Sequence, residues 1–342
     1  MPREPGLPSV SVLIPTYRYA SKLENTVRAL LPDPAATQII VVVDGCRDGS
    51  LEILETLHDE DPRVTPMLVE HVGKSGALSA ALERAEGEVV LLLDQDVVAR
   101  PGLVSGHAAH HRDAEHLVVL GYMPTLTDES DGRVAMLTKC YADEYEAHVT
   151  FLEEHPEEVL LQLWGGNVSL RRDDCALVGL DFRYFGHEDQ DFGIRCLKAG
   201  LTGRFDRTLL AEHHHSRTAT QFLWYSKMQG ASRWLIHEEH ADLVGPYDPD
   251  STLEGLPPVI RGLTALIATP RLGDRSAQVL VTLGDLCARF HWIRGESGAY
   301  RLARRVEFRT GASLARDGRE LSGPQHHTSS RSADRPPYAA SR

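Results

Sequence analysis

The first hundred residues alternate between two patterns, and this alternation constrains the fold more than any other feature. Short runs rich in Val, Ile and Leu occupy 9–14, 38–43, 64–69 and 88–93. Segments with helical spacing lie between them, at 21–31, 50–58 and 75–85. Apolar runs separated by helices are typical of βαβ units and of a mostly parallel sheet covered on both faces. We therefore expect an α/β fold whose ligands bind beyond the carboxyl ends of the strands.

The rest of the chain divides by composition. Residues 101–160 carry a polar, helical pattern, and helical spacing returns at 219–240 and 256–293. The final residues are rich in Ser, Pro and Arg, a composition typical of disorder. We predict four parts: an N-terminal extension at 1–8, one α/β domain at 9–218, a helical C-terminal region at 219–320 and a disordered tail at 321–342.

Composition argues against several classes of function. The formal net charge of −13 disfavours a nucleic-acid binder, which needs a basic face. The five cysteines are odd in number and include no C-x-x-C pair, so neither a disulfide framework nor a structural zinc site is expected. No run of 18 apolar residues occurs, and the N-terminus lacks an apolar core, so we expect no transmembrane segment and no signal peptide. These features predict a cytoplasmic protein.

Polar residues follow each of the first three apolar runs. The stretch "PTYR" (15–18) follows the first run and can present backbone amides and a tyrosine ring. Asp44 ends the second run, where its carboxylate can accept hydrogen bonds from a base or ribose. Lys74 lies in "GKSGALSAAL" after the third, where small residues opening a helix suit close approach to phosphate. Each pattern alone also suits an ordinary turn or a solvated helix start.

Asp94 and Asp96 follow the most apolar run, "EVVLLL". Carboxylates at the end of a buried strand are costly unless they are paired or neutralised. Because residues i and i+2 of a strand point the same way, the two side chains can converge on one target. Carboxylate oxygens suit Mg²⁺ or Mn²⁺ bridging a diphosphate, so the pattern favours a metal–nucleotide site.

Three consecutive histidines, residues 213–215, follow a further short apolar run. Such tracts are often incidental surface features. Here the tract ends an expected strand in a chain that already holds Asp-x-Asp, so one imidazole is a candidate metal ligand and would favour Mn²⁺-like ions. Alternation along a strand would let His213 and His215 face one way and His214 the other.

The stretch "FGHEDQDFGIR" (185–195) places Glu188, Asp189 and Asp191 within four positions. Three such acids can open a helix, hold a metal or perform acid–base chemistry. Acids in a first turn complement the helix dipole, and Phe192 and Cys196 give the helix a buried face. A separate candidate metal site already exists, so acid–base chemistry is favoured, with Asp191 expected to be structural.

Taken in order, these motifs resemble the inverting family 2 glycosyltransferases of the GT-A fold, a mostly parallel Rossmann-like sheet flanked by helices, here with a helical C-terminal appendage. The resemblance covers about residues 9–217 and rests on "PTYR", "VVVDGCRDGS", "GKSGALSAAL", "LLLDQD", "WGGNVSLRR" and "GHEDQDFGIRCLKAG". The last segment and the following His-Ser-Arg are similar to those of galactosyltransferase-like members. The family often has two acids at the second strand, whereas Val43 precedes Asp44 here.

The resemblance implies a donor site and a metal site. Nine residues would bind the nucleotide sugar: Pro15, Thr16, Tyr17, Asp44, Lys74, Asp94, Gly165, Gly166 and Asn167. Pro15 to Tyr17 and Asp44 would serve the base and ribose, and the glycines and Asn167 would shape the sugar pocket. Asp96 would coordinate Mn²⁺ or Mg²⁺ across the diphosphate, with His215, or alternatively His213, completing the metal site.

The resemblance also implies the chemistry. Asp189 would be the general base and Glu188 its neighbour contacting sugar or acceptor hydroxyls. The expected reaction is hexosyl transfer with inversion from a nucleotide-diphosphate sugar, with UDP as the expected nucleotide, to an acceptor hydroxyl. A glycan, a lipid-linked sugar, a peptide or a small molecule could supply that hydroxyl, and a lipid-linked acceptor would place the protein peripherally at the inner membrane face. The alternatives are a sugar-nucleotide nucleotidyltransferase, although "PTYRYASKLEN" lacks its glycine-rich loop, and an inactive nucleotide-sugar-binding protein.

Overall fold

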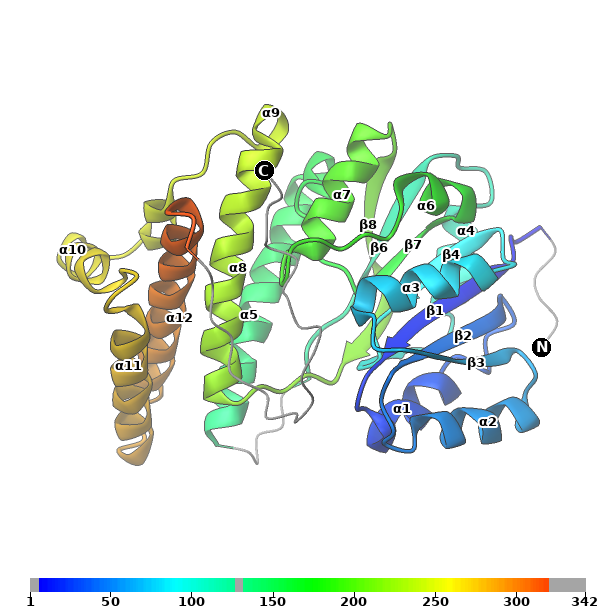
Figure 1. Cartoon of the computed structure of the whole chain (residues 1–342), viewed down its shortest axis with the longest axis horizontal. Helices are drawn as coiled ribbons and strands as arrows, with labels where there is room; N and C mark the ends of the chain where they lie inside the picture. Colours follow the sequence, from blue (N-terminus) through cyan, green and yellow to red (C-terminus); the bar gives the residue numbers. More distant parts are fainter. Residues whose placement is uncertain (1–5, 127–131, 320–342) are drawn as a thin grey trace. The chain divides into compact units, whose positions relative to one another are not determined.

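The computed structural model describes residues 6–126 and 132–319, which fall into two compact units (Figure 1). Unit 1 contains the chain up to Thr127, Tyr141–Phe182 and Asp189–His215. Unit 2 contains Asp128–Cys140, Arg183–Glu188 and the chain from Ser216 onward. The tail predicted at 321–342 and most of the extension predicted at 1–8 lie outside the described residues.

Unit 1 is a mixed α/β layer structure. Its strands are β1 (Val10–Thr16), β2 (Ala36–Asp44), β3 (Val64–Val69), β4 (Val89–Leu93), β5 (Val97–Ala99), β6 (Leu117–Tyr122), β7 (Asn167–Arg171) and β8 (Thr202–His213). Its helices are α1 (Ala20–Arg28), α2 (Ser50–Glu60), α3 (Gly73–Arg84), α4 (Leu103–His110), η2 (Pro156–Glu158), α6 (Arg172–Val178) and α7 (Glu188–Lys198). Helix α5 (Arg133–Glu154) begins in unit 2 and continues in unit 1.

The eight strands form one sheet in the order β3-β2-β1-β4-β7-β6-β8-β5. The strands formed by the alternating N-terminal segments pair in parallel, β1 with β2 and β4, and β2 with β3. Strands β6 and β8 are also parallel, whereas β7 runs antiparallel to both its neighbours and β5 runs antiparallel to β8. The predicted α/β fold with a mostly parallel sheet is therefore confirmed.

Strand alternation fills both sides of this sheet. Val12 and Ile14 of β1 pack in one apolar cluster with residues of α1 and α2, while Leu13 packs in the other with residues of α3. Figure 1 shows α1 and α2 on the opposite side of the strands from α3. Because successive side chains point to opposite faces, a strand covered on both sides must be apolar throughout. This requirement explains the continuous Val, Ile and Leu runs.

The prediction of a helical segment over 101–160 is wrong in part, because β6 lies between α4 and α5. Its sequence, "LVVLGY", is buried along nearly its whole length. A short apolar run of this kind fits a strand or a buried helical turn equally well, so periodicity cannot distinguish the two. Pairing with β7 and β8 on its two sides decides the outcome.

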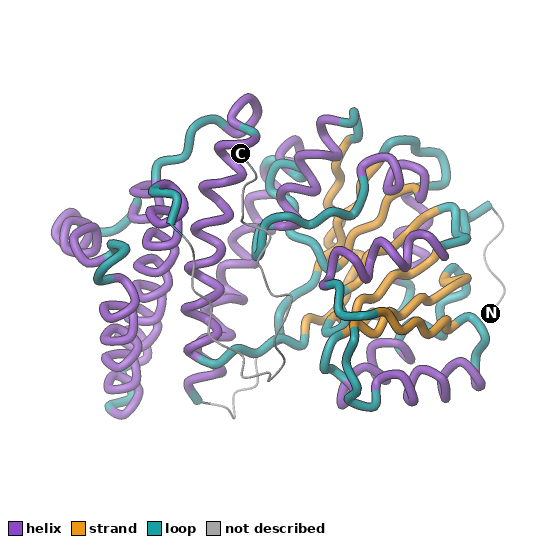
Figure 2. The backbone as a smooth tube through the Cα atoms, viewed as in Figure 1, coloured by secondary structure: helices purple, strands orange, loops and turns teal. Residues whose placement is uncertain are grey.

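The described residues of unit 2 form helices joined by loops, with no strand among them (Figure 2). Besides the start of α5 it contains α8 (Ala219–Glu239), α9 (Ala241–Val244), η3 (Pro249–Leu253), α10 (Pro258–Ile267), α11 (Gly273–Arg289) and α12 (Ile293–Arg316). Helix α12 packs against both α8 and α11. Unit 2 has an apolar core of its own, which includes Phe222, Val281 and the fully buried Tyr300. Within the described residues no helix is long and apolar enough to cross a membrane.

Two glycines let α8 and α12 approach closely. A Cβ at Gly230 would lie 1.8 Å from the Phe308 carbonyl oxygen, and one at Gly311 would lie 1.8 Å from that of Lys227. Both obstacles are helix backbone, which cannot move aside without separating the helices. Any side chain at either position would therefore open the α8–α12 contact.

Gly311→Ala should destabilise the protein by about 1–3 kcal/mol, the usual cost of overpacking. Gly298→Ala is the matched control, because Gly298 lies in the same helix and a Cβ added there would meet no atom within 4 Å. Alanine there should be neutral or stabilise the fold by up to about 1 kcal/mol through helix propensity. Urea denaturation of both variants measures the difference, and equal midpoints would contradict the close contact.

Candidate active site

The site in unit 1 is built around the turn that follows β4. Strand β4 ends at Leu93, and residues 94–96 turn before β5 begins. Gln95 fastens this turn to β1, since its Oε1 accepts hydrogen bonds from Thr16 Oγ1 at 2.8 Å and from the Tyr17 amide at 2.9 Å. Asp94 and Asp96, on either side of Gln95, have different side-chain partners.

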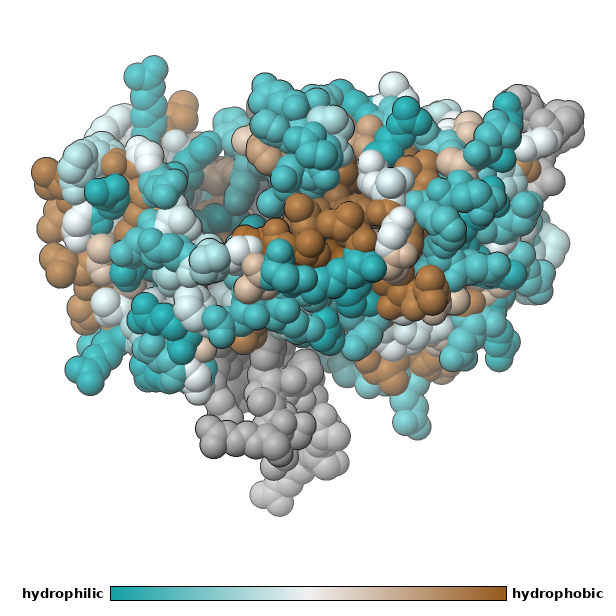
Figure 3. Space-filling model, turned by 90° about the horizontal axis from the view of Figure 1, so that it is seen from above, coloured by the Kyte–Doolittle hydropathy of each residue, from teal (hydrophilic) through white to brown (hydrophobic). Residues whose placement is uncertain are grey.

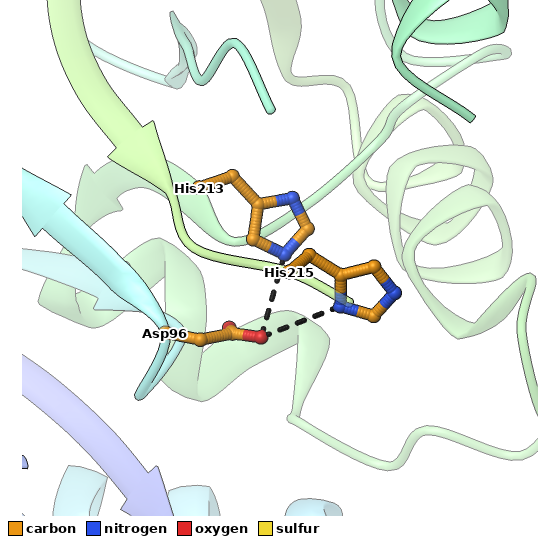
Figure 4. A group of neighbouring side chains, drawn as sticks. All are labelled: Asp96, His213 and His215. Carbon is orange, nitrogen blue, oxygen red and sulfur yellow. Dashed lines mark ion pairs between the residues drawn. The ribbon is translucent and has the colours of Figure 1, made fainter. Parts of the chain in front are cut away.

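Asp96 faces two histidines at the end of β8 (Figure 4). Its Oδ2 lies 3.4 Å from His213 Nε2 and 3.5 Å from His215 Nδ1. His214 lies on the other side, 3.8 Å from Glu212 Oε2, so the alternation expected along a strand is observed. Burial opposes ionisation of Asp96, but the hydrogen bonds and charges of the two histidines outweigh it and hold the pKa of this carboxyl far below its usual range.

The three ligand atoms suit a divalent cation. One oxygen of Asp96 and one nitrogen each of His213 and His215 all lie within 4.8 Å of one another. A set of one carboxylate and two imidazoles is better matched to Mn²⁺ than to Mg²⁺, which prefers oxygen ligands alone. The Tyr141 ring packs against both histidine rings, with centroids 5.9 Å from His213 and 5.2 Å from His215. This packing restricts the orientation of both rings.

Asp94 faces a separate pocket together with Asp189. Lys74 Nζ, from the first turn of α3, lies 2.9 Å from Asp94 Oδ1. Lys74, Asp94 and Asp189 line one pocket, whose wall also includes Phe182. Residues 94–96 form a turn rather than a strand, and Asp94 and Asp96 have different side-chain partners. Their predicted convergence on one bound ligand stays a prediction.

The two glycines of "WGGNVSL" make room for these carboxylates. A Cβ at Gly165 would lie 2.5 Å from Asp189 Oδ1, and one at Gly166 would lie 3.0 Å from Asp94 Oδ2. Gly166 also has a φ of +105°, which disfavours any other residue. The glycines thus let the backbone contact both acids directly, and the Gly165 amide donates a hydrogen bond to Asp189.

Burial raises the pKa of the Asp189 carboxyl above its ordinary value. The Lys74 ammonium acts in the opposite direction, the Asp94 carboxylate adds to the increase, and the hydrogen bond from Gly165 lowers it again. A carboxyl whose pKa is raised by burial in a cleft is a stronger base once ionised, which suits proton abstraction.

Asp191, the third acid of the cluster, is paired with an arginine, which fits the structural role predicted for it. It is fully buried, and its Oδ2 lies 3.0 Å from Nε of Arg195, one helical turn later. The same guanidinium donates to the carbonyls of Val178 and Gly179 at 2.8 Å and 2.9 Å. Pairing Asp191 with Arg195 relieves the repulsion among the three acids. Glu188, the first residue of α7, is half-buried beside Asp189 in the chain.

The residues expected around the base gather at the ends of β1 and β2. Asp44 Oδ1 accepts from the Val72 amide at 2.7 Å, and Oδ2 accepts from the Gly73 amide at 3.0 Å, so this carboxylate caps α3. The His71 ring, 2.9 Å from Asp44 Oδ2, stacks on Tyr17 with centroids 4.8 Å apart. Oδ1 keeps a second lone pair, so contact between Asp44 and a nucleotide remains a prediction.

Two of the predicted donor-site side chains are buried inside the fold. Thr16 is bound to Gln95, and Asn167 is fully buried, with its Oδ1 2.9 Å from His107 Nε2 and its Nδ2 donating to the Leu209 carbonyl at 3.0 Å. Their side chains therefore position β1 and β7, whereas Pro15, Gly165 and Gly166 line the pocket itself.

Sequence reasoning missed three residues that shape the site. Gln95 lies between the two acids of "DQD", and no local pattern indicates that its side chain binds β1. His71 is the second residue after the third apolar run. The rule that ligands bind at the carboxyl ends of strands could have identified it. Tyr141 carries no local signal, because only folding brings α5 beside the histidines.

Comparison with known proteins identifies a family for this part of the chain. The family model described as glycosyl transferase family 2 matches residues 11–178, which include β1 to β7 and the turn bearing Asp94 and Asp96. Residues 11–178 are a glycosyl transferase family 2 domain. This is the family that the sequence motifs resemble.

Curated relatives agree with the assignment of this domain. The chain is 26% identical over 250 residues to an uncharacterized glycosyltransferase of Bacillus subtilis, covering 59% of this chain and 64% of that protein. It is 34% identical over 98 residues to an undecaprenyl-phosphate 4-deoxy-4-formamido-L-arabinose transferase of Pseudomonas aeruginosa, covering 27% of this chain and 29% of the relative. The chain spans less than two thirds of the length of the first curated relatives it matches.

A solved structure confirms the GT-A fold. A mannosyltransferase from Pyrobaculum calidifontis, in complex with GDP-Man and Mn²⁺, superposes with a TM-score of 0.50 over 88% of this chain and 86% of its own. Its sequence identity of 15% makes this a statement about the fold alone.

His213→Ala and His215→Ala should each weaken Mn²⁺ binding by at least about tenfold, the loss that even outer-shell partners of a metal cause. His214→Ala is the control, because its ring faces Glu212 rather than Asp96. Mn²⁺ titration followed by electron paramagnetic resonance measures free ion directly. A loss of affinity equal in all three variants would contradict the site.

Proposed function

We propose that this protein is a metal-dependent, inverting glycosyltransferase. It would move a sugar from a nucleotide-diphosphate sugar, with UDP as the first candidate nucleotide, to an acceptor hydroxyl. The observation that carries the proposal is the division of the acids in unit 1. Asp189 shares a pocket with Lys74 and Asp94, whereas Asp96 faces two histidines. The first group would serve base catalysis, and the second would hold a cation.

Asp189 would act as the general base. Its carboxylate takes the proton of the acceptor hydroxyl as that oxygen forms a bond to the anomeric carbon, and the bond from that carbon to the diphosphate oxygen breaks on the opposite face. The departing diphosphate is a stable anion, so no carboxylic acid is needed to protonate it, in contrast to a glycosidase. One base is therefore sufficient for inversion.

Asp96, His213 and His215 would hold the cation, with Mn²⁺ favoured by the two imidazoles. When bound, a divalent cation offsets the negative charge that grows on the leaving diphosphate. Lys74 would sit close to the donor, paired with Asp94. Glu188 would contact sugar or acceptor hydroxyls next to Asp189.

Pro15, Tyr17 and Asp44 would bind the base and ribose at the ends of β1 and β2. Since a mannosyltransferase of the same fold was solved with GDP-Man, guanine belongs among the candidate bases beside uracil. The acceptor is a hydroxyl on a glycan, a lipid-linked sugar, a peptide or a small molecule. A relative named as an undecaprenyl-phosphate transferase makes a lipid phosphate a further acceptor to include.

A donor panel tests the proposal. With Mn²⁺ present, UDP-, GDP- and dTDP-sugars are incubated with the protein, and nucleoside diphosphate and pyrophosphate are measured separately. Slow release of nucleoside diphosphate from one donor supports a transferase. Pyrophosphate exchange with a nucleoside triphosphate would instead identify a nucleotidyltransferase.

In the same assay Asp189→Asn should lower turnover by about 10²–10⁴-fold while donor affinity is kept, because the amide preserves shape but cannot accept a proton.

Lys74→Met should shift the acid limb of the pH–rate profile to higher pH. Asp189 must be ionised to act, so activity is lost as pH falls through its pKa, and the Lys74 ammonium lowers that pKa. Removing the ammonium raises it, and Lys74→Arg, which keeps the charge, should leave the limb near its original position. The profile of kcat/KM against pH measures both. A limb that stays fixed in Lys74→Met would contradict the assignment of Asp189 as the base.

A further inference from the structure

Large apolar side chains gather on the surface of one segment of unit 2. Of nineteen large apolar residues that are exposed in the described part of the chain, eleven lie between 259 and 293. Figure 3 shows brown side chains along the left edge of the view, where Figure 1 draws α10 and α11. We call these residues the α10–α11 face: Val259, Ile260, Leu263, Leu266, Leu272, Val279, Leu283, Leu286, Phe290, Trp292 and Ile293.

Helix α10 turns its apolar residues to solvent. Val259, Leu263 and Leu266 follow the spacing of one helix face, and they are exposed by 74%, 59% and 70%. Thr264 is the one buried residue among the ten of this helix, all of which are described. A helix of this composition normally buries its apolar face. The exposed face of α10 therefore indicates a binding surface.

Helix α11 has two apolar faces with different residues. The inner face packs against α12 through small side chains, and at Gly273 and Gly284 an added Cβ would meet Thr310 and Tyr300. It comprises Gly273, Ala277, Val281 and Gly284. The outer face, on the opposite side by the 3.6-residue period, comprises Val279, Leu283, Leu286 and Phe290. Large residues thus occupy the side that α12 does not cover.

The charge of this segment is opposite to that of the chain. Residues 257–294 contain five arginines and two acids, in a chain of net charge −13. Both acids are engaged within unit 2, Asp274 with Lys227 and Asp285 with Arg133 and Tyr300. The arginines are all exposed: Arg261, Arg271, Arg275, Arg289 and Arg294.

We propose that the α10–α11 face docks on an anionic lipid surface. Exposed aliphatic residues, aromatic residues such as Phe290 and Trp292, and flanking arginines are the three components of an interfacial helix. A second copy of the chain is a weaker candidate, since a self-complementary contact would bring the same arginines against one another. The tail at 320–342 is weaker still, because Leu321 and Tyr338 are its only large apolar residues.

Vesicle sedimentation of the full chain tests this docking. Vesicles of phosphatidylcholine alone are compared with vesicles of equal parts phosphatidylcholine and phosphatidylglycerol. Binding should be tighter to the anionic vesicles, should weaken with added salt, and should fall by about fivefold for each arginine replaced in Arg261→Gln and Arg289→Gln. Leu263→Ser with Leu266→Ser should lower binding by about tenfold or more.

Leu177→Ser is the matched control, because Leu177 is 72% exposed but lies in α6 of unit 1. It should bind vesicles like the original chain. Equal binding to both kinds of vesicle, no binding to either, or a dimer in ultracentrifugation that the Leu263 and Leu266 changes dissociate would each overturn the proposal. Release of nucleoside diphosphate from a donor sugar should be unchanged in the serine variants, so a failure of docking is distinguishable from a failure of the proposed reaction.

Discussion

The ion pair between Lys74 and Asp94 is the contact on which the site depends. It joins the first turn of α3 to the end of β4, in the pocket that also contains Asp189. Carboxylates at the ends of buried strands repel one another and resist leaving water. The lysine offsets both effects, and it also limits how far burial raises the pKa of Asp189. Without it, burial and the Asp94 carboxylate would raise the pKa of Asp189 further.

The same requirement is met differently at three other acids of the site. Asp96 faces two histidines, Asp191 is paired with Arg195, and Asp44 accepts from the amides that open α3. These partners set the chemistry available to each carboxylate. A pair of imidazoles leaves room for a cation, a guanidinium fixes the acid in place, and Asp189 keeps the raised pKa that suits a base.

Much of this could be predicted from local pattern. The βαβ alternation indicated the sheet, the Asp-x-Asp after β4 and the alternating histidines indicated the two sides of a metal site, and a structural role for Asp191 followed from its place in the helix. Strand β6 was missed because a six-residue apolar run fits strand and helix alike. The side chain of Asn167 was assigned to the pocket, although its neighbours His107 and Leu209 hold it within the fold.

The sequence by itself determined the fold class, the family and the residue types of the site, because strand and helix periods and strand-end acids are local properties. Only the tertiary structure decided which acid meets which partner. Lys74 and Asp94 are twenty positions apart, and Asp96 and His213 more than a hundred, so no spacing rule could join them. It also left α10 and the outer side of α11 uncovered. Exposure depends on what packs nearby, and neighbours in space are not encoded in any short stretch of chain.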